Sequence, residues 1–371
     1  MLSGALGIRM LLWTGKMIPA PPSKDVLDAL VDVEVTNDAR EADAFRITFS
    51  LTKDLIEYDL LLSGALDPMT KVTIAVVMGV VPEVLINGVI THHDISPSAE
   101  PGASRLTVYG KDLSLLLDLE DRNEKYEVQP DFVIFSQLIL QYAAHGLVPD
   151  PRPTSDIPLP FDRIPHQAET DLDFILRMAE RNGYSFYIEP LTIGVSQAYF
   201  GPPSRLGLPQ PALTAGIGGH DNVTDLAVSL NSTAPVGVKG SFIEPFTKMS
   251  LPLPELPSLR VPPLALFPTT PIKKSLVRSS AQKNPAQAAL AGLAETMKAE
   301  DSVKVTGQLD GAKYGSVLRA RKLVGLRAIG YSFSGNYYVQ KVTHKLSRGS
   351  YTQSFELSRE GTGAILPVVR T

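Results

Sequence analysis

The sequence predicts a mainly β fold with α insertions, an α+β class in which two β modules are separated by a helix-containing inserted domain. Three features of the 371 residues support this class: short alternating strands near both ends, a helical period between them, and a proline-rich stretch before the last strands. The predicted segments are a first β module at 1–120, a helical α/β insertion at 121–200, return strands and a connection at 201–249, a proline-rich arm or linker at 250–283, and a second β module at 284–371.

The first module is predicted from strand patterns between residues 25 and 116. Apolar and polar residues alternate in two early stretches, 31–35 and 45–49, and residues 71–78 are β-branched and apolar. A turn rich in proline, serine and glycine at 96–102 separates two further strand-like stretches. Several short strands with frequent turns favour a sandwich or a barrel.

The insertion is predicted to contain two helices, at 131–144 and from 171 to about 182. At the start of the second helix, Thr170 can accept a hydrogen bond from the backbone, with Asp173 at the third helical position in an arrangement like a capping box. At its end, Gly183 fits the left-handed conformation that terminates helices. We therefore expect Thr170, Asp173 and Gly183 to have structural roles.

The segment before the last strands is predicted to be an extended arm or linker. Residues 250–272 contain seven prolines, which remove backbone donors and fix φ, so a core strand or a helix is excluded there. A helix is predicted after Asn284 and Pro285. The remaining residues are predicted to be strands, the last two forming a hairpin about the turn at 347–350.

The composition and the candidate polar clusters give no sign of chemistry. Cysteine is absent, and no apolar run approaches the ~20 residues that a transmembrane helix needs. His92 and His93 are neighbours on a predicted strand and point to opposite faces, and Asp171 and Asp173 are explained by the positive end of a helix dipole. The sequence predicts no catalytic, cofactor-binding or metal-binding residue, and we therefore expect that the protein is not an enzyme. It also predicts no transmembrane segment.

Charge is divided unevenly along the chain. Residues 1–238 contain 16 basic and 31 acidic side chains, whereas residues 239–371 contain 19 basic and 8 acidic ones. Such a division predicts a partner of opposite sign, either nucleic acid or another copy of the chain. Four basic residues lie near aromatic ones in the C-terminal part: Arg319, Arg321, Lys322 and Arg327. We favour a charged rim on a β module over a nucleic-acid surface, and expect no direct nucleic acid binding.

Two stretches resemble a known family of tail proteins. Residues 171–183, Asp-Leu-Asp-Phe-Ile-Leu-Arg-Met-Ala-Glu-Arg-Asn-Gly, are similar to the pattern D-x-D-F-L-x-R-L-A-E-x-x-G of VgrG and phage late-control-D proteins, and an aromatic strand follows them. Residues 335–344 and 351–359 resemble that family's closing strands, G-x-Y-x-V-x-x-V-x-H and F-x-L-x-R. The resemblance covers roughly residues 25–360.

The resemblance implies a structural baseplate hub of a phage tail or contractile injection system. Each subunit would supply two related, tube-like β-barrel modules, and a homotrimer would form a ring that adapts a sixfold tail tube to a threefold spike. The implied partners are a separately encoded spike protein, because the chain stops soon after the second module, and inner tube and baseplate proteins. The resemblance also implies assembly in the cytoplasm and incorporation into a phage virion tail or an injection particle.

Other interpretations stay open at this point. In a ring of alternating modules, the four basic residues could contact the acidic half of a neighbouring copy. A receptor- or glycan-binding tail-tip protein is an alternative function, and a cell-wall hydrolase is a weaker one. The sequence does not distinguish a phage from an extracellular or cell-anchored injection system, and it does not identify the cargo, the target cell or the role of the arm.

Overall fold

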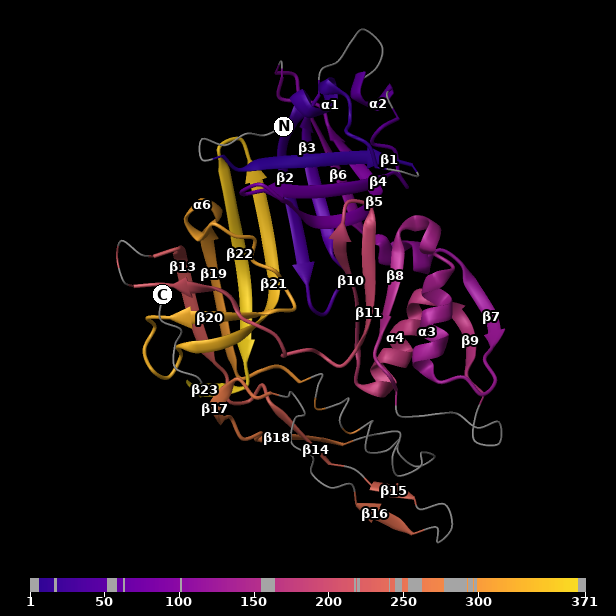
Figure 1. Ribbon diagram of the computed structural model, residues 1–371, viewed down its shortest axis with the longest axis vertical. Coiled ribbons are helices and arrows are strands. Elements are labelled where there is room, and N and C mark those ends of the chain that lie inside the picture. The colour runs from indigo at the N-terminus through magenta and orange to yellow at the C-terminus, as the bar shows by residue number, and fades with distance from the viewer. Residues whose placement is uncertain are drawn as a thin grey trace.

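The structure of the protein is a computed structural model, drawn as a ribbon in Figure 1. The residues that it describes are 7–16, 19–51, 59–62, 64–100, 102–154, 164–216, 218, 221–239, 241–243, 249–252, 262–276, 292, 296 and 299–365. The helix expected after Asn284 lies outside the described residues except at positions 292 and 296, and so does a large part of the expected arm.

Six strands form the first lobe. They hydrogen-bond in the order β1-β4-β5-β6-β3-β2, and every neighbouring pair is antiparallel. The bounds are β1 Arg9–Gly15, β2 Leu30–Asp38, β3 Ala44–Ser50, β4 Lys71–Val77, β5 Pro82–Ser96 and β6 Arg105–Asp112, with short helices α1 Lys24–Ala29 and α2 Asp59–Leu62. Apolar residues on one face of these strands, including Ile47, Phe49 and Ile74, are fully buried in one core. Removal of that face from water stabilises the strands that the alternation predicts.

Six more strands form the second lobe, and they come from two separate segments of the chain. The bounds are β12 Gln210–Thr214, β13 Val223–Leu230, β19 Val303–Asp310, β20 Leu323–Arg327, β21 Gly335–Ser347 and β22 Ser350–Arg359, with the short helix α6 Gly311–Tyr314. The antiparallel order is β21-β22-β19-β13, and β20 pairs with both β21 and β12. The segment 201–249 thus contributes β12 and β13 to the same lobe as the C-terminal strands. Tyr337, Val342 and Leu357 are buried in its core.

The two lobes share one twelve-stranded sheet because β2 pairs with β21. This pairing is antiparallel and extends from Asp32 opposite Ser347 to Asp38 opposite Lys341. In Figure 1 the long strands β21 and β22 lie beside β2 and β3. Continuous backbone hydrogen bonding makes the lobes one body.

The insertion leaves the sheet after β6 and returns before β12. Its elements are η1 Leu113–Asp118, β7 Asp121–Lys125, α3 Asp131–Leu140, η2 Ala143–His145, β8 Leu147–Pro151, β9 His166–Thr170, α4 Asp171–Asn182, β10 Ser185–Thr192 and β11 Val195–Gly201. The strands form a small sheet in the order β10-β11-β8, and β7 pairs with β9. The insertion has a buried core of its own, which includes Phe135 of α3, Phe174 of α4 and Phe200 of β11. The insertion lies to the right of the long sheet in Figure 1.

The ends of the second insertion helix are fixed by side chains and by glycine. Thr170 Oγ1 accepts a hydrogen bond from the backbone N–H of Asp173 at 3.2 Å, and Gly183 adopts a φ of +65° after the last helical residue. Asp131, at the start of α3, accepts hydrogen bonds from Arg181 and Asn182 at the end of α4. These contacts join the two helices at opposite ends.

Between β13 and β19, the described parts of the connection and of the arm consist of short paired strands, and we call all of these the arm strands. Their bounds are β14 Val236–Lys239, β15 Ser241–Ile243, β16 Ser250–Pro252, β17 Ala265–Pro268 and β18 Lys273–Leu276. β14 pairs with β18, β15 with β16, and β17 with β23 Gly361–Ala364, which follows β22. The arm strands lie below the lobes in Figure 1.

The predicted fold class, mainly β with helical insertions, is confirmed. Within the part of the chain that the structure describes, no helix is long and apolar enough to cross a membrane.

Candidate functional site

The region where the two lobes and the insertion meet contains a buried polar network that we call the seam: Arg321, Asp43, Asp112, Asn37 and Tyr187. Arg321 lies just before β20, is only 7% exposed, and has a φ of +66°. A residue other than glycine pays roughly 1–2 kcal/mol for such a left-handed backbone, so its contacts must compensate. Its guanidinium donates to Asp43 through Nη2 at 2.5 Å and through Nη1 at 3.2 Å, and Nη2 also donates to the carbonyl of Asp38 at 2.5 Å.

The Asp43 carboxylate is the acceptor at the centre of the seam. Besides Arg321, it accepts hydrogen bonds from Asn37 Nδ2 at 2.8 Å and from the backbone N–H of Asp38 at 2.9 Å. A second buried carboxylate, Asp112, accepts from the backbone N–H groups of Asp43 and Ser114. Burial, and then the negative charge of Asp43, raise the pKa of Asp112 to about 6. The seam therefore places two carboxylates beside one guanidinium.

The seam extends into the insertion through an aromatic ring. The Arg321 guanidinium carbon lies 4.5 Å from the ring centroid of Tyr187, which belongs to β10. Burial alone would lower the pKa of Arg321, but the charge of Asp43 and the hydrogen bonds to it raise that pKa above its ordinary value. The ion pair and the stacking contact of such a guanidinium are strongest where water is excluded. One side chain thus connects the second lobe to the first lobe and to the insertion.

Two neighbours of Arg321 also contact the acidic part of the same chain. Arg319 donates to the carbonyl of Val84 at 2.5 Å and to Glu83 at 3.1 Å, both on β5. Lys322 Nζ lies 3.3 Å from a carboxylate oxygen of Glu189 on β10, and both side chains are substantially exposed. Arg327 is the last residue of β20 and lies opposite Thr214 of β12. Arg319, Arg321 and Lys322 thus bring basic and acidic parts together within one chain.

A buried asparagine connects the insertion to the first lobe at a second place. Asn87 on β5 places Nδ2 within 2.9–3.0 Å of the carbonyls of Thr192 and Val195 and of Ser196 Oγ. Its Oδ1 accepts from Thr73 Oγ1 at 2.7 Å and from the backbone N–H of Gly194 at 3.1 Å. A buried amide with satisfied donors and acceptors fixes the turn between β10 and β11 against the sheet.

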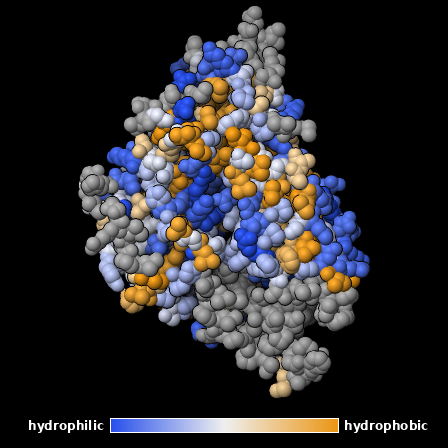
Figure 2. All heavy atoms as spheres, viewed as in Figure 1, coloured by the Kyte–Doolittle hydropathy of each residue, from blue (hydrophilic) through white to orange (hydrophobic). Residues whose placement is uncertain are grey.

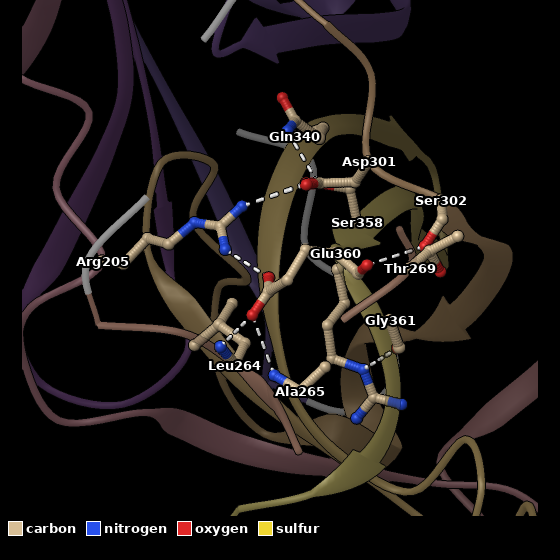
Figure 3. Close-up of polar contacts among 11 residues, drawn as sticks. Arg205, Leu264, Ala265, Thr269, Asp301, Ser302, Gln340, Ser358, Glu360 and Gly361 are labelled. Carbon is tan, nitrogen blue, oxygen red and sulfur yellow. Dashed lines mark hydrogen bonds and ion pairs between the residues drawn. The ribbon is translucent and has the colours of Figure 1, made fainter. Parts of the chain in front are cut away.

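A second buried cluster, which we call the clasp, lies at the base of the arm and is drawn in Figure 3: Arg205, Asp301 and Glu360. Arg205, which follows the insertion, is 4% exposed. It donates to both carboxylate oxygens of Asp301, at 3.1 and 3.3 Å, and to Glu360 at 2.5 Å. The three residues come from segments far apart in sequence, so the clasp joins the entry to β12, the entry to β19 and the end of β22.

The clasp also fixes the arm. Glu360 Oε1 accepts hydrogen bonds from the backbone N–H groups of Leu264 and Ala265, the latter at 2.9 Å. The Glu360 carbonyl accepts from Ser302 Oγ at 2.9 Å and from the backbone N–H of Thr269 at 3.0 Å. Figure 3 shows these groups converging on Glu360 from separate segments of the chain. The base of the arm is thus fixed to the end of β22.

A groove between α4 and the turn after β2 has a volume of about 430 Å³. Its lining includes Arg40, Leu176, Glu180 and Phe186, so charges of both signs face an apolar wall. In Figure 2 hydrophilic side chains gather near the middle of the visible face, between two hydrophobic areas. Among the described residues that line the groove, Glu180 is the one carboxylate.

Several carboxylates in the described part of the chain are held by partners within the same chain. The carboxylates of Asp43, Asp131, Asp171 and Glu360 accept hydrogen bonds from side chains or backbone of the same chain. His92, one of the two adjacent histidines, stacks on Tyr109 at 4.7 Å. Among the described residues, no group of three histidine or carboxylate side chains could hold a metal ion. The arrangement holds distant parts of the chain in fixed positions.

Sequence reasoning missed most of these residues. It selected Arg321 from a cluster of basic residues, but gave no indication of Asp43, Asn87, Arg205 or Glu360. These are single polar residues without a motif, and only their burial identifies them. A lone acidic residue between two strands, such as Asp43, carries no local signal of its partner.

The chain is similar in fold to solved tail proteins. No protein-family model matches it, and no curated protein matches it in sequence. The tail protein from Neisseria meningitidis MC58 is 13% identical, with a TM-score of 0.64 over 95% of this chain and 97% of that one. The 43 kDa tail protein of prophage MuSo2 from Shewanella oneidensis is 14% identical, with a TM-score of 0.63 over 95% and 98%.

A further similarity is to a chain in the structure of the Francisella PdpA–VgrG complex. It is 10% identical, with a TM-score of 0.54 over 98% of this chain and 54% of that one. Together these similarities show that the chain shares its fold with solved tail proteins and with about half of a chain in the PdpA–VgrG complex. The fold that the sequence resemblance predicts is thereby confirmed.

Proposed function

We propose that this chain is a structural baseplate hub subunit, which forms a trimeric ring that adapts a sixfold tail tube to a threefold spike. The observation that carries the proposal is the twelve-stranded sheet that joins the two lobes in one chain. Two lobes a chain and three chains would give six lobes, which matches the symmetry of the tube while keeping that of the spike.

The seam supports this function because an adaptor must hold its two lobes at a fixed angle. Backbone pairing of β2 with β21, the buried Arg321–Asp43 contact and the Asn87 amide all restrict movement between the parts. A rigid subunit loses little conformational freedom when it assembles, which favours a closed ring. No covalent chemistry is required of any residue.

Several finer points belong to the same proposal. The lobes would be the two tube-like β-barrel modules, the first within the predicted bounds 1–120 and the second made of the predicted 284–371 module together with β12 and β13. The partners would be a separate spike protein, inner tube proteins and other baseplate proteins, in a phage virion tail or an injection particle assembled in the cytoplasm. The exposed part of Lys322 would face a neighbouring copy, because Arg319 and Arg321 already contact acidic or carbonyl groups of their own chain.

Electron microscopy of the purified full chain tests the proposal. We expect class averages of a ring with six similar lobes and a central opening. Isolated two-lobed particles at every protein concentration would contradict the ring. A loss of rings in the Arg321→Met variant, with the wild-type fold retained by circular dichroism, would show that the fixed angle between the lobes matters.

A further inference from the structure

Five strands of the first lobe have counterparts in the second lobe, in the same order along the chain and in the sheet. The first lobe places β2, β3, β6, β5 and β4 side by side, and the second lobe places β13, β19, β22, β21 and β20 in the same way. Every neighbouring pair in both sets is antiparallel. By position, β13 is therefore the counterpart of β2, and β5 is the counterpart of β21.

Irregularities of the backbone align β5 with β21 residue by residue. Met69 and Arg321 each have a φ of +66°, and each lies two residues before its strand, β4 or β20. The backbone N–H of Met69 donates to the carbonyl of Ile90, and that of Arg321 donates to the carbonyl of Val339, both at 2.8 Å. One residue is bulged directly after Ile90 in β5 and directly after Val339 in β21. Ile90 thus occupies the position of Val339.

The edge strands β2 and β13 align in the same way. In both strands one residue is bulged directly after the first paired residue, which is Leu30 in β2 and Val223 in β13. Counted from these bulges, Val228 occupies the position of Val35. Val35 is fully buried and lies opposite His344 in the joint between the lobes, whereas Val228 is 37% exposed. A position that is covered at the joint within the chain is therefore open on β13.

The two strand edges that could form a second joint are both open. In the part of the chain that the structure describes, β13 pairs only with β19, and residues 92–96 of β5 pair only with β6. On the other edge of β5, β4 and the residues before it bond only as far as Ile90. Ile95 is 40% exposed and Leu230 is 52% exposed. Proteins usually protect such edges with charge, proline or a covering segment, so these open edges indicate partner strands.

We propose that β13 of one copy pairs antiparallel with residues 92–98 of the next copy, which repeats between chains the joint that β2 and β21 make within one chain. This inference rests on the proposed ring and names the strands that close it. The alignment of the two lobes fixes the register, because each strand inherits the partner of its counterpart. Val228 then lies opposite Ile95, and Ser229 lies opposite Asp94.

The apolar side chains of both edges fit this register. Side chains directly opposite each other in an antiparallel pair lie on the same face of the sheet. Val228 and Ile95, each more than a third exposed in the single chain, would cover one another. Leu230 would lie opposite His93 on that face. Removal of these apolar surfaces from water would stabilise the joint.

The polar side chains on the other face fit the same register. At the joint within the chain, the hydroxyl oxygens of Thr36 and Thr343 lie 3.2 Å apart. Ser229 and Asp94 occupy the positions of these two residues, so a hydroxyl would donate to a carboxylate there. Lys304 of β19 lies opposite Ser229 and brings a positive charge to that face. Opposite charges would then favour this pairing.

A joint that is repeated in this way closes a ring. The joint within the chain relates one lobe to the next by a fixed rotation. If the joint between chains is the same, each successive lobe follows by the same rotation, and three chains contribute six equivalent joints. The contact between β13 and β5 therefore explains how a chain of two lobes gives a ring of six.

Disulfide trapping tests the strand contact directly, because the chain has no cysteine of its own. We expect Ser229→Cys combined with Asp94→Cys in the full chain to give covalent dimers and trimers on a non-reducing gel after mild oxidation. Thr36→Cys with Thr343→Cys is the matched positive control and should form its disulfide within one chain, which leaves a monomer on the gel. Thr224→Cys with Asp94→Cys moves one cysteine five residues along β13 and should abolish the dimers and trimers.

A charge placed on the apolar face of β13 gives a second test. Val228→Asp should raise the concentration at which half the chains are trimeric by roughly tenfold or more, because the joint would bury an unpaired carboxylate. Val148→Asp places the same charge at an exposed apolar position of the insertion and should leave that concentration unchanged. Light scattering over a range of concentrations measures both variants, and circular dichroism checks that each retains the wild-type fold.

The outcomes separate the strand contact from the ring itself. A trimer that is not trapped by Ser229→Cys with Asp94→Cys, although the positive control forms its disulfide, and that Val228→Asp does not weaken would overturn the β13–β5 contact and leave the ring proposal intact. A chain that is monomeric under all conditions would overturn both. Trapping in the expected register, together with weakening by Val228→Asp, would support both.

Discussion

Two buried arginines hold distant segments of this chain together, in different electrostatic surroundings. Arg321 in the seam faces Asp43 with Asp112 close behind it, and burial and Asp43 raise the pKa of Asp112 to about 6. Arg205 in the clasp faces Asp301 and Glu360, whose oxygens also accept from Ser358 and from backbone N–H groups. In both clusters two carboxylates lie beside one guanidinium and accept further hydrogen bonds, but Asp43 and Asp112 of the seam are both buried, whereas Glu360 of the clasp is partly exposed.

The two arginines also connect different parts of the chain. The seam joins the lobes to each other and to the insertion, so its loss should affect the whole body. The clasp joins the arm and two chain entries to the second lobe, so its loss should act locally. Four variants test this contrast, from the largest expected effect to the smallest.

Arg321→Met should lower the free energy of unfolding by about 3–5 kcal/mol. It leaves Asp43 buried without its cation, and breaking one side of a buried pair is among the costliest changes. Chemical denaturation measured by fluorescence and circular dichroism checks the value. A loss below about 1 kcal/mol would show that the seam does not hold the lobes together.

Asp112→Asn should change how stability depends on pH. The pKa of Asp112 is about 6 when folded and near the ordinary 3.8 when unfolded, so the folded chain binds this proton more tightly. The stabilisation that comes from protonated Asp112 is complete at pH values below the pKa of this group in the unfolded chain. It is lost as the pH rises through the pKa of the group in the folded chain. Between pH 4 and 7 the wild type should lose roughly 2–3 kcal/mol more than the variant. Parallel profiles for the two proteins would rule out this titration.

Arg205→Ala should cost about 2 kcal/mol, less than the change in the seam. Glu360 keeps its bonds to Leu264 and Ala265, and Asp301 keeps its bond to Ser358, so the freed carboxylates stay partly satisfied. Limited proteolysis should then cut the arm faster while the lobes stay resistant. Arg152→Ala, which removes an exposed pair with Asp150, is the matched control and should leave proteolysis unchanged.

Lys322→Ala should change stability by less than about 1 kcal/mol. Its ion pair with Glu189 is exposed to solvent, and such pairs contribute little because water and salt screen them. Thermal unfolding at low and high salt checks this. A loss comparable to that of Arg321→Met would mean that exposure does not decide the strength of these contacts.

The parts of the fold that depend on local patterns could be predicted from the sequence, whereas those that depend on contacts between distant residues could not. The first lobe and the two insertion helices follow from local periodicity and end signals, such as Thr170 and Gly183. The pairing of β12 and β13 with strands of the C-terminal segment could not be predicted, because about seventy residues separate β13 from β19. Arg321 and Asp43 are 278 residues apart, and no local pattern encodes such a pair. The basic cluster located one side of the seam, but not its partners.

The solution mass of the full chain, measured by light scattering at low and at high salt, tests the central claim most directly. The account predicts three times the mass of one chain at low salt, with a shift toward the monomer at high salt, because opposite charges meet at the joints. The mass of a single chain in both conditions, at all concentrations, would contradict the account of this chain as a ring-forming hub.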